Sequence, residues 1–146
     1  MFEQHGTYWV GIDKEIILFE AAGEWNVEAS NTCISIIKQL IDTLKGKKFG
    51  MLIDSREIKG ITPDTFDAWI NAIEYWHTKG HSATTRIDDP SSAYYKNFLS
   101  GFDDELKITT KFKFSNTVSD GIRWLNENGF SGFESGKDGI HGFSNR

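Results

Sequence analysis

The sequence contains little cysteine, fewer basic than acidic residues, and no long apolar run. Cys33 is the only cysteine, which excludes an intramolecular disulfide and a cysteine-based metal cage. Sixteen Lys and Arg residues stand against 21 Asp and Glu residues, and a net charge of -5 argues against nucleic-acid binding. No apolar run approaches the ~18 residues of a membrane span, and the stretch MFEQHGTYWVG lacks the features of a secretory signal. We therefore expect a cytoplasmic protein without a membrane span.

The composition is that of a globular domain. The chain has 146 residues, of which 38% are hydrophobic and 25% are charged. A chain of this length typically buries about 70% of its unfolded surface, so a sizeable core forms without disulfides or metals. The aromatic share of 14%, with five Trp and eleven Phe, is high and implies a large apolar surface to bury or to present.

Alternating and helical patterns divide the chain into short elements. Residues 8–12 and 15–22 are expected to form strands joined by a tight turn at Asp13-Lys14, which predicts an antiparallel hairpin. Further strands are expected at residues 48–54, 82–87 and 107–114, and helices at residues 27–45, 62–80, a short stretch after Asp89-Pro90, and 117–129. The order ββαβαβαβα predicts an α/β fold with a mixed five-stranded sheet, an N-terminal antiparallel hairpin and flanking helices.

A change of composition marks the end of this pattern. Residues 1–130 are expected to form a single domain, whereas residues 131–146 are rich in Gly and Ser and are typical of a flexible C-terminal tail. The alternative is that Phe133, Ile140 and Phe143 dock on the domain.

Three stretches carry a family resemblance: the opening hairpin that ends in Ala22-Gly23, the strand MLID with its following loop, and the stretch FKFSNTVSDGIRWL. In this order they resemble the STAS-like group, specifically the uncharacterised SpoIIAA-like bacterial proteins, over roughly residues 6–130. These proteins are related to the anti-sigma-factor antagonists, and their fold is similar to that of Sec14-type lipid-binding domains. The resemblance implies a non-catalytic regulatory or protein-interaction module.

The resemblance also directs attention to one loop. Phosphoswitch members of the group carry an Asp-Ser-Ser-Gly stretch before a helix, and one of its serines takes the phosphate. The matching positions here are Gly60-Ile61-Thr62-Pro63, where Thr62 is the only hydroxyl, while Asp54-Ser55 lies several residues earlier. Thr62 is therefore the candidate phosphorylation site. Its simpler interpretation is a helix N-cap, worth about 1 kcal/mol.

Other candidate sites depend on fewer residues. His77 and His81 are four residues apart, as metal ligands on one helix face would be, but Gly80 intervenes and no third ligand stands at a suitable spacing. Asp88-Asp89 is typical of a helix start. No G-x-S-x-G, P-loop or G-x-G-x-x-G motif occurs, and Cys33 falls on an apolar helix face. We predict no catalytic residue, metal or cofactor. An enzyme would require Asp54, Asp88 or His77 to converge on one pocket.

The aromatic residues suggest a binding surface. Trp69, Tyr75 and Trp76 share one expected helix, and Tyr94 and Phe98 share another. The simplest explanation is core packing; the functional one is a hydrophobic groove or dimer face for a protein partner or a second copy of the chain. An alternative is an apolar, lipid-like small molecule in a cleft lined by Trp69, Trp76 and Tyr94. The predicted binding surface consists of Asp54, Ser55, Thr62, Trp69, Tyr75, Trp76, Tyr94 and Phe98.

Overall fold

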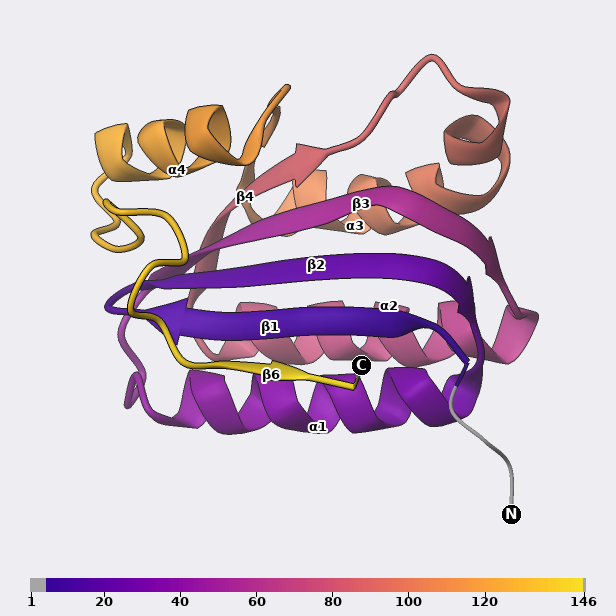
Figure 1. Cartoon of the computed structure of the whole chain (residues 1–146), viewed down its shortest axis with the longest axis horizontal. Coiled ribbons are helices and arrows are strands. Elements are labelled where there is room, and N and C mark those ends of the chain that lie inside the picture. Colours follow the sequence, from indigo (N-terminus) through magenta and orange to yellow (C-terminus); the bar gives the residue numbers. More distant parts are fainter. Residues whose placement is uncertain (1–4, 146) are drawn as a thin grey trace.

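The computed structural model describes residues 5–145 and shows one mixed sheet with helices on both faces (Figure 1). The elements are β1 (Thr7–Asp13), β2 (Ile16–Trp25), α1 (Val27–Asp42), β3 (Phe49–Ile61), α2 (Pro63–Thr78), β4 (His81–Ile87), a π-helical turn η1 (Tyr95–Leu99), α3 (Ser100–Thr109), β5 (Lys111–Phe114), α4 (Val118–Glu127) and β6 (Gly142–Ser144). The strand order is β5-β4-β3-β2-β1-β6. Strands β2 to β5 run parallel, whereas β1 is antiparallel to both of its neighbours.

The predicted hairpin, the order of elements as far as α4 and the starts of α1, α2 and α4 are confirmed. In the β1–β2 hairpin Asp13 pairs with Ile16, and Lys14 adopts the left-handed conformation at φ 51°. The side chain of Asn26 accepts a hydrogen bond from Ala29 N at the start of α1. These local signals are readable from sequence because each depends on residues close together in the chain.

The two faces of the sheet bury separate hydrophobic clusters. The larger cluster lies between the sheet and helices α1, α2 and α3, and contains Cys33, Phe49 and Trp76. The smaller cluster lies under α4 and contains Leu52, Leu125 and Phe133. Along β3 the side chains alternate between the two, with Met51 and Ile53 on the first face and Leu52 on the second, as the strand pleat requires.

Three boundaries differ from the sequence prediction. The segment after Asp54, expected as a loop, continues β3 as far as Ile61. The helix expected after Pro90 is longer than the short stretch that was predicted, because η1 leads directly into α3. The strand expected from Lys107 therefore begins at Lys111, and Ile108, assigned to its apolar face, lies in α3 with 80% of its surface exposed.

The predicted five-stranded sheet is corrected to six strands. The sixth strand comes from the Gly/Ser-rich C-terminal segment: β6 pairs with β1, with Val10 opposite Phe143. Phe133 is only 2% exposed, and its N–H donates to Asp13 Oδ2 at 2.7 Å. Composition predicted a tail here because a strand of three residues with two small side chains has almost no hydrophobic pattern.

The helices of the described residues are all too short or too polar to cross a membrane.

Candidate functional site

The candidate site lies at the edge of the sheet where the parallel strands end. Strand β4 pairs with β3 only as far as Asp54 opposite Ile87, whereas β2 follows β3 to Trp25 opposite Ile61. The segment Arg56–Ile61, called here the β3 extension, therefore has a strand neighbour on one side only among the described residues. Two register shifts bend it where it pairs with β2. Such an open strand edge carries backbone groups able to pair with another chain.

Asp54 and Ser55 stand where β3 leaves β4. Asp54 is 8% exposed and holds Arg56 through two contacts, Nε to Oδ1 at 3.0 Å and Nη2 to Oδ2 at 2.7 Å. This hydrogen bonding is the main cause that raises the pKa of Arg56. Ser55 is 1% exposed, and its hydroxyl donates to Asp88 Oδ2 at 2.5 Å. Ser55 thus ties β3, at the point where its pairing with β4 ends, to the residue that follows β4.

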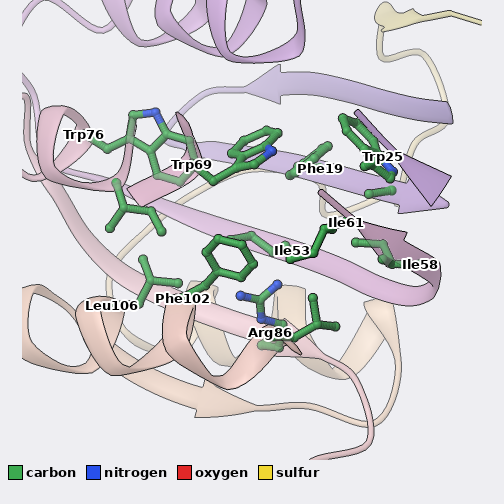
Figure 2. A pocket seen from close by; sticks show the side chains of 13 residues that line it. Phe19, Trp25, Ile53, Ile58, Ile61, Trp69, Trp76, Arg86, Phe102 and Leu106 are labelled. Carbon is green, nitrogen blue, oxygen red and sulfur yellow. The ribbon is translucent and has the colours of Figure 1, made fainter. Parts of the chain in front are cut away.

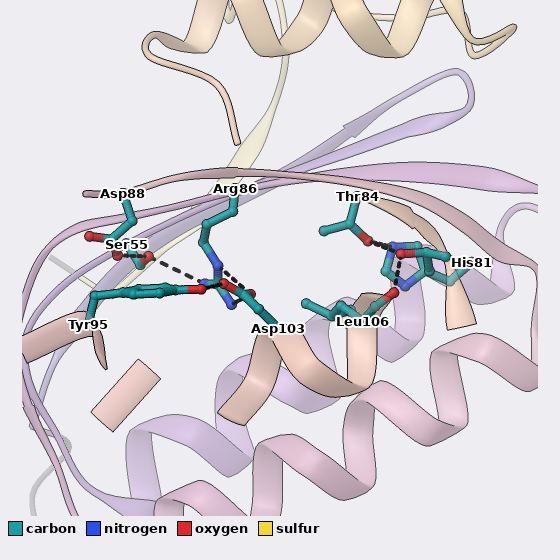
Figure 3. Close-up of polar contacts among 9 residues, drawn as sticks. Ser55, His81, Thr84, Arg86, Asp88, Tyr95, Asp103 and Leu106 are labelled. Atoms are coloured by element: carbon teal, nitrogen blue, oxygen red, sulfur yellow. Dashed lines mark hydrogen bonds and ion pairs between the residues drawn. The ribbon is translucent and has the colours of Figure 1, made fainter. Parts of the chain in front are cut away.

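Behind Ser55 lies a buried polar network (Figure 3). Arg86 on β4 donates from Nε and Nη2 to Asp103 Oδ1, at 2.9 and 2.6 Å, and from Nη1 to Ser55 Oγ at 3.3 Å. The Tyr95 hydroxyl donates to the second oxygen of Asp103. Burial, followed by this hydrogen bond, raises the pKa of Tyr95. Buried charges require such partners, and the network fixes η1 and α3 against the sheet.

In front of Ser55 is an open hollow of about 460 Å³, called here the polar hollow. It carries both signs of charge and is lined by Ser55, Arg56, Ile58, Lys59, Asp88, Asp89, Ser92 and Tyr94. The Tyr94 hydroxyl is buried and has no hydrogen-bond partner within residues 5–145. Burial and the charge of Asp88 raise the pKa of the Tyr94 hydroxyl. Phe98, 51% exposed, packs against Tyr94 with ring centroids 5.1 Å apart and the rings tilted by 34°.

Thr62 occupies the N-cap position of α2, but its predicted capping bond is absent. The side chain makes no hydrogen bond to a backbone N–H of the first turn. Thr62 Oγ1 instead contacts Asp64 Oδ1 at 2.5 Å and Thr65 Oγ1 at 2.6 Å, while Asp64 accepts from Thr65 N at 3.0 Å. The aspartate performs the capping because its carboxylate reaches the backbone from inside the first turn. Thr62 stays exposed.

Trp69 and Trp76 lie in the interior and not on a surface. They are 9% and 1% exposed, and both line a largely apolar cavity of about 50 Å³ between the sheet, α2 and α3 (Figure 2). The indole N–H of Trp69 donates to Ser30 Oγ at 2.9 Å. Tyr94, which the sequence placed in the same cleft, does not line it. Tyr75 lies apart, with the ammonium groups of Lys38 and Lys79 over its ring.

The structure separates the residues considered for metal binding or catalysis. Asp54 and Asp88 lie where the parallel strands end, whereas His77 lies in the last turn of α2, which leads to the start of β4. His81 opens β4 with 2% exposure, so it does not share a helix face with His77. No group of three or more potential metal ligands occurs among residues 5–145.

The sequence prediction missed the partners of Ser55. Arg86 lies in the expected strand 82–87 and was given no role, but it is in the interior at 4% exposure. Asp103 is 0% exposed and comes from a helix whose start was not predicted. The only available signal was a basic residue within an expected strand, which requires an acid from elsewhere in the chain if the strand is buried.

The chain was compared with protein families and curated proteins by sequence, and with solved structures by fold. No protein-family model matches the chain. No curated protein matches its sequence.

Solved structures do match. One is an uncharacterized DUF3478-family protein with a SpoIIAA-like fold from Shewanella loihica PV-4, with a TM-score of 0.63, 16% identity, and 86% of this chain and 98% of that chain covered. Another is an anti-sigma factor antagonist from Mycobacterium paratuberculosis, with a TM-score of 0.53, 12% identity, and 82% and 92% covered. At these identities the likeness concerns the fold alone. The predicted STAS-like architecture is confirmed: the chain has a SpoIIAA-like fold.

Proposed function

We propose that the protein is a non-catalytic regulatory module that binds a protein partner through the β3 extension and the neighbouring Tyr94–Phe98 turn. The observation that carries this proposal is the open edge of the β3 extension. An extended segment of a partner can add a strand there, as in other proteins that bind by strand addition. A second copy of this chain is the alternative partner.

The polar hollow and Phe98 give this edge its specificity. Backbone pairing supplies affinity for any extended chain, whereas side-chain pockets select the sequence. The polar hollow offers charges of both signs beside the edge, and Phe98 adds an exposed aromatic ring of the kind enriched at interfaces. That one structural neighbour is an anti-sigma factor antagonist is consistent with a protein partner.

A substitution of Phe98 tests this proposal. Phe98→Asp places a charge on a side chain that is already half exposed, so the fold should persist. We expect quantitative affinity purification from the native host, together with light scattering of the pure protein, to show loss of a specific partner or of the dimer. Ile108→Asp is the matched control, because Ile108 is 80% exposed and lies on α3 outside the proposed surface. Equal partner sets and equal masses for wild type and Phe98→Asp would refute the proposal.

Within this proposal Thr62 is the regulatory phosphorylation site. Of the two candidate hydroxyls, Ser55 is buried and bonded to Asp88, whereas Thr62 is exposed beside the β3 extension. A phosphate on Thr62 would gain from the N-terminus of α2 and lose from the Asp64 carboxylate. The added charge would thereby alter partner binding at the same surface. Phosphopeptide mapping of protein from the native host should find the modification at Thr62; its absence under all growth conditions would remove this role.

Binding of an apolar, lipid-like molecule is supported only by the position of the cavity at Trp69 and Trp76. Its volume of about 50 Å³ argues against this function. Ligand pockets usually measure roughly 300–1,000 Å³, and benzene occupies an engineered cavity of about 150 Å³. A lipid chain would therefore have to displace α2 or α3 and break the packing that surrounds the two tryptophans. The protein-interaction function is the one that the geometry supports better.

A further inference from the structure

A second hollow lies at the other end of the parallel strands, on the side of the sheet where these strands begin. It measures about 380 Å³ and is bounded by the ends of α2 and α3 and the starts of β4 and β5. Its lining includes Lys48, His77, His81, Thr110 and Lys111. It is called here the basic hollow, and it shares no residue with the proposed partner-binding surface.

The charge of the basic hollow has one sign. No Asp or Glu lines it, although the protein as a whole carries a net charge of -5. Lys48 and Lys111 make no ion pair with another part of residues 5–145. The polar hollow, by contrast, combines Arg56 and Lys59 with Asp88 and Asp89. Two unpaired ammonium groups at one concave surface favour an anion.

Basic residues also occur at helix C-termini for a structural reason, because they balance the helix dipole. Each helix end contributes about half a negative charge, so α2 and α3 together offset about one of the two lysine charges. Some carbonyls near these helix ends are moreover already bonded: Thr109 Oγ1 donates to Glu105 O at 3.2 Å, Thr110 Oγ1 to Leu106 O at 2.6 Å and, in α2, Thr78 Oγ1 to Tyr75 O at 2.6 Å. The lysines are therefore not required as caps, and a positive charge remains.

A hydrogen-bonded chain in the wall determines the tautomer of His81 (Figure 3). Thr110 uses its one hydroxyl proton on Leu106 O, so the contact of 2.9 Å between Thr84 and Thr110 must be donated by Thr84. Thr84 then accepts from His81 Nε2 at 2.9 Å. The proton of the neutral imidazole is thereby placed on Nε2, which leaves Nδ1 with a bare lone pair.

Nδ1 of His81 is a buried acceptor without a hydrogen-bond partner in the described part of the chain. An unpaired buried acceptor costs roughly 1–3 kcal/mol, so a donor that reaches it is favoured. A fully deprotonated anion has no donor to offer. A phosphate group that retains one proton supplies both parts: charged oxygens for Lys48 and Lys111, and a P–OH group for the imidazole. Nδ1 itself is buried, so the wall of the basic hollow around His81 has to open before a P–OH group reaches this atom.

We propose that the basic hollow binds a small phosphate-bearing anion, either inorganic phosphate or the singly protonated form of a soluble phosphomonoester, with Lys48 and Lys111 as its charge partners. The ammonium groups would contact the phosphate oxygens directly. His81 would recognise the protonated oxygen and so distinguish phosphate from sulfate. A phospholipid headgroup offers the same phosphate chemistry, but it is attached to a membrane, so the whole membrane surface has to approach the hollow.

Isothermal titration calorimetry in chloride buffer tests the proposal, with inorganic phosphate and glycerol 3-phosphate as probes. We expect at least one of them to bind wild type, and Lys48→Gln/Lys111→Gln to weaken that binding by tenfold or more. Lys96→Gln/Lys113→Gln removes the same charge outside the basic hollow and should stay within twofold of wild type. Amide chemical shifts should change at Gly80, Ser82 and Lys111, which line or flank the hollow. Thermal melts establish that both double variants are folded.

Sulfate and vesicles complete the test. Sulfate should bind at least tenfold more weakly than phosphate at pH 7, because it offers no proton to His81 Nδ1. Neutral phosphatidylcholine vesicles with added phosphatidic acid should not retain the protein. No binding of either soluble probe, or equal losses in both double variants, would overturn the proposal. Retention on vesicles without binding of soluble phosphate would assign the lysines to a lipid headgroup instead.

Discussion

Arg86 and Asp103 form an ion pair in the interior of the protein, with 5% and 0% of their side chains exposed. Nε and Nη2 of Arg86 both donate to Oδ1 of Asp103, and Oδ2 accepts a hydrogen bond from the Tyr95 hydroxyl. The pair joins β4 to α3 and forms the back of the candidate site through the contact of Arg86 with Ser55. A buried pair of this kind is costly to break because the remaining charge has no water around it.

Asp103→Ala should therefore destabilise the protein by about 3–5 kcal/mol, since it leaves the Arg86 charge buried and unpaired. Urea denaturation followed by tryptophan fluorescence measures the effect. The control is Asp120→Ala, which breaks an exposed pair with Arg123 at 3.2 Å and should cost about 0–1 kcal/mol. Similar losses for the two variants would show that the interior pair is solvated.

The stability of the protein should fall in mild acid because of His81. Burial lowers the pKa of this histidine to about 3, against roughly 6.5 in the unfolded chain. Below pH 6.5 the unfolded state binds a proton that the folded state does not accept, so the free energy of unfolding decreases until the pH approaches 3. At pH 5 the loss due to this one group is about 2 kcal/mol.

His81→Gln isolates this effect, because glutamine retains an N–H donor for Thr84 but does not titrate. We expect the free energy of unfolding of the variant to change less than that of wild type between pH 7 and pH 5, by about 2 kcal/mol. Parallel pH curves for the two proteins would show that His81 has the same pKa in the folded and the unfolded state.

The fold was predictable because its signals are local. The apolar face of α1, the Pro63 start of α2 and the cap at Thr117 each depend on a few neighbouring residues, and each is found where expected. The mixed character of the sheet followed from the order of the elements, since parallel strands require crossover helices. The sixth strand did not follow, because its pairing with β1 depends on residues more than a hundred positions apart in the sequence.

The candidate site was only partly predictable. Asp54, Ser55, Thr62, Tyr94 and Phe98 were selected and do lie around one edge of the sheet. Trp69 and Trp76 were selected for the same surface but are buried, because a helix with aromatic residues on its core face gives the same periodicity as one with a binding face. Arg86 and Asp103 depend on the approach of α3 to β4, which no local pattern indicates.

Cys33 should be inert in the folded protein. The thiol is completely buried on α1, and burial raises its pKa, which suppresses the reactive thiolate. With a disulfide reagent at pH 8 we expect labelling to be slow and to accelerate in proportion to the unfolded fraction as urea is added. Rapid and complete labelling without urea would mean that α1 opens locally from the sheet.

Gly132 should strictly require glycine because its neighbour is backbone that cannot move aside. Its φ is +143°, and a Cβ atom there would lie 2.2 Å from the backbone oxygen of Asp13. Gly132→Ala should therefore displace the segment from the β1–β2 turn and destabilise the protein by about 1–3 kcal/mol, with faster proteolysis between Phe133 and Asn145. Gly136→Ala is the matched control: its φ is +63° with nothing within 4 Å, so it should cost about 1 kcal/mol and leave β6 paired. If limited proteolysis cuts both variants at the same rate, the contact between Gly132 and Asp13 is not what holds the sixth strand on the sheet.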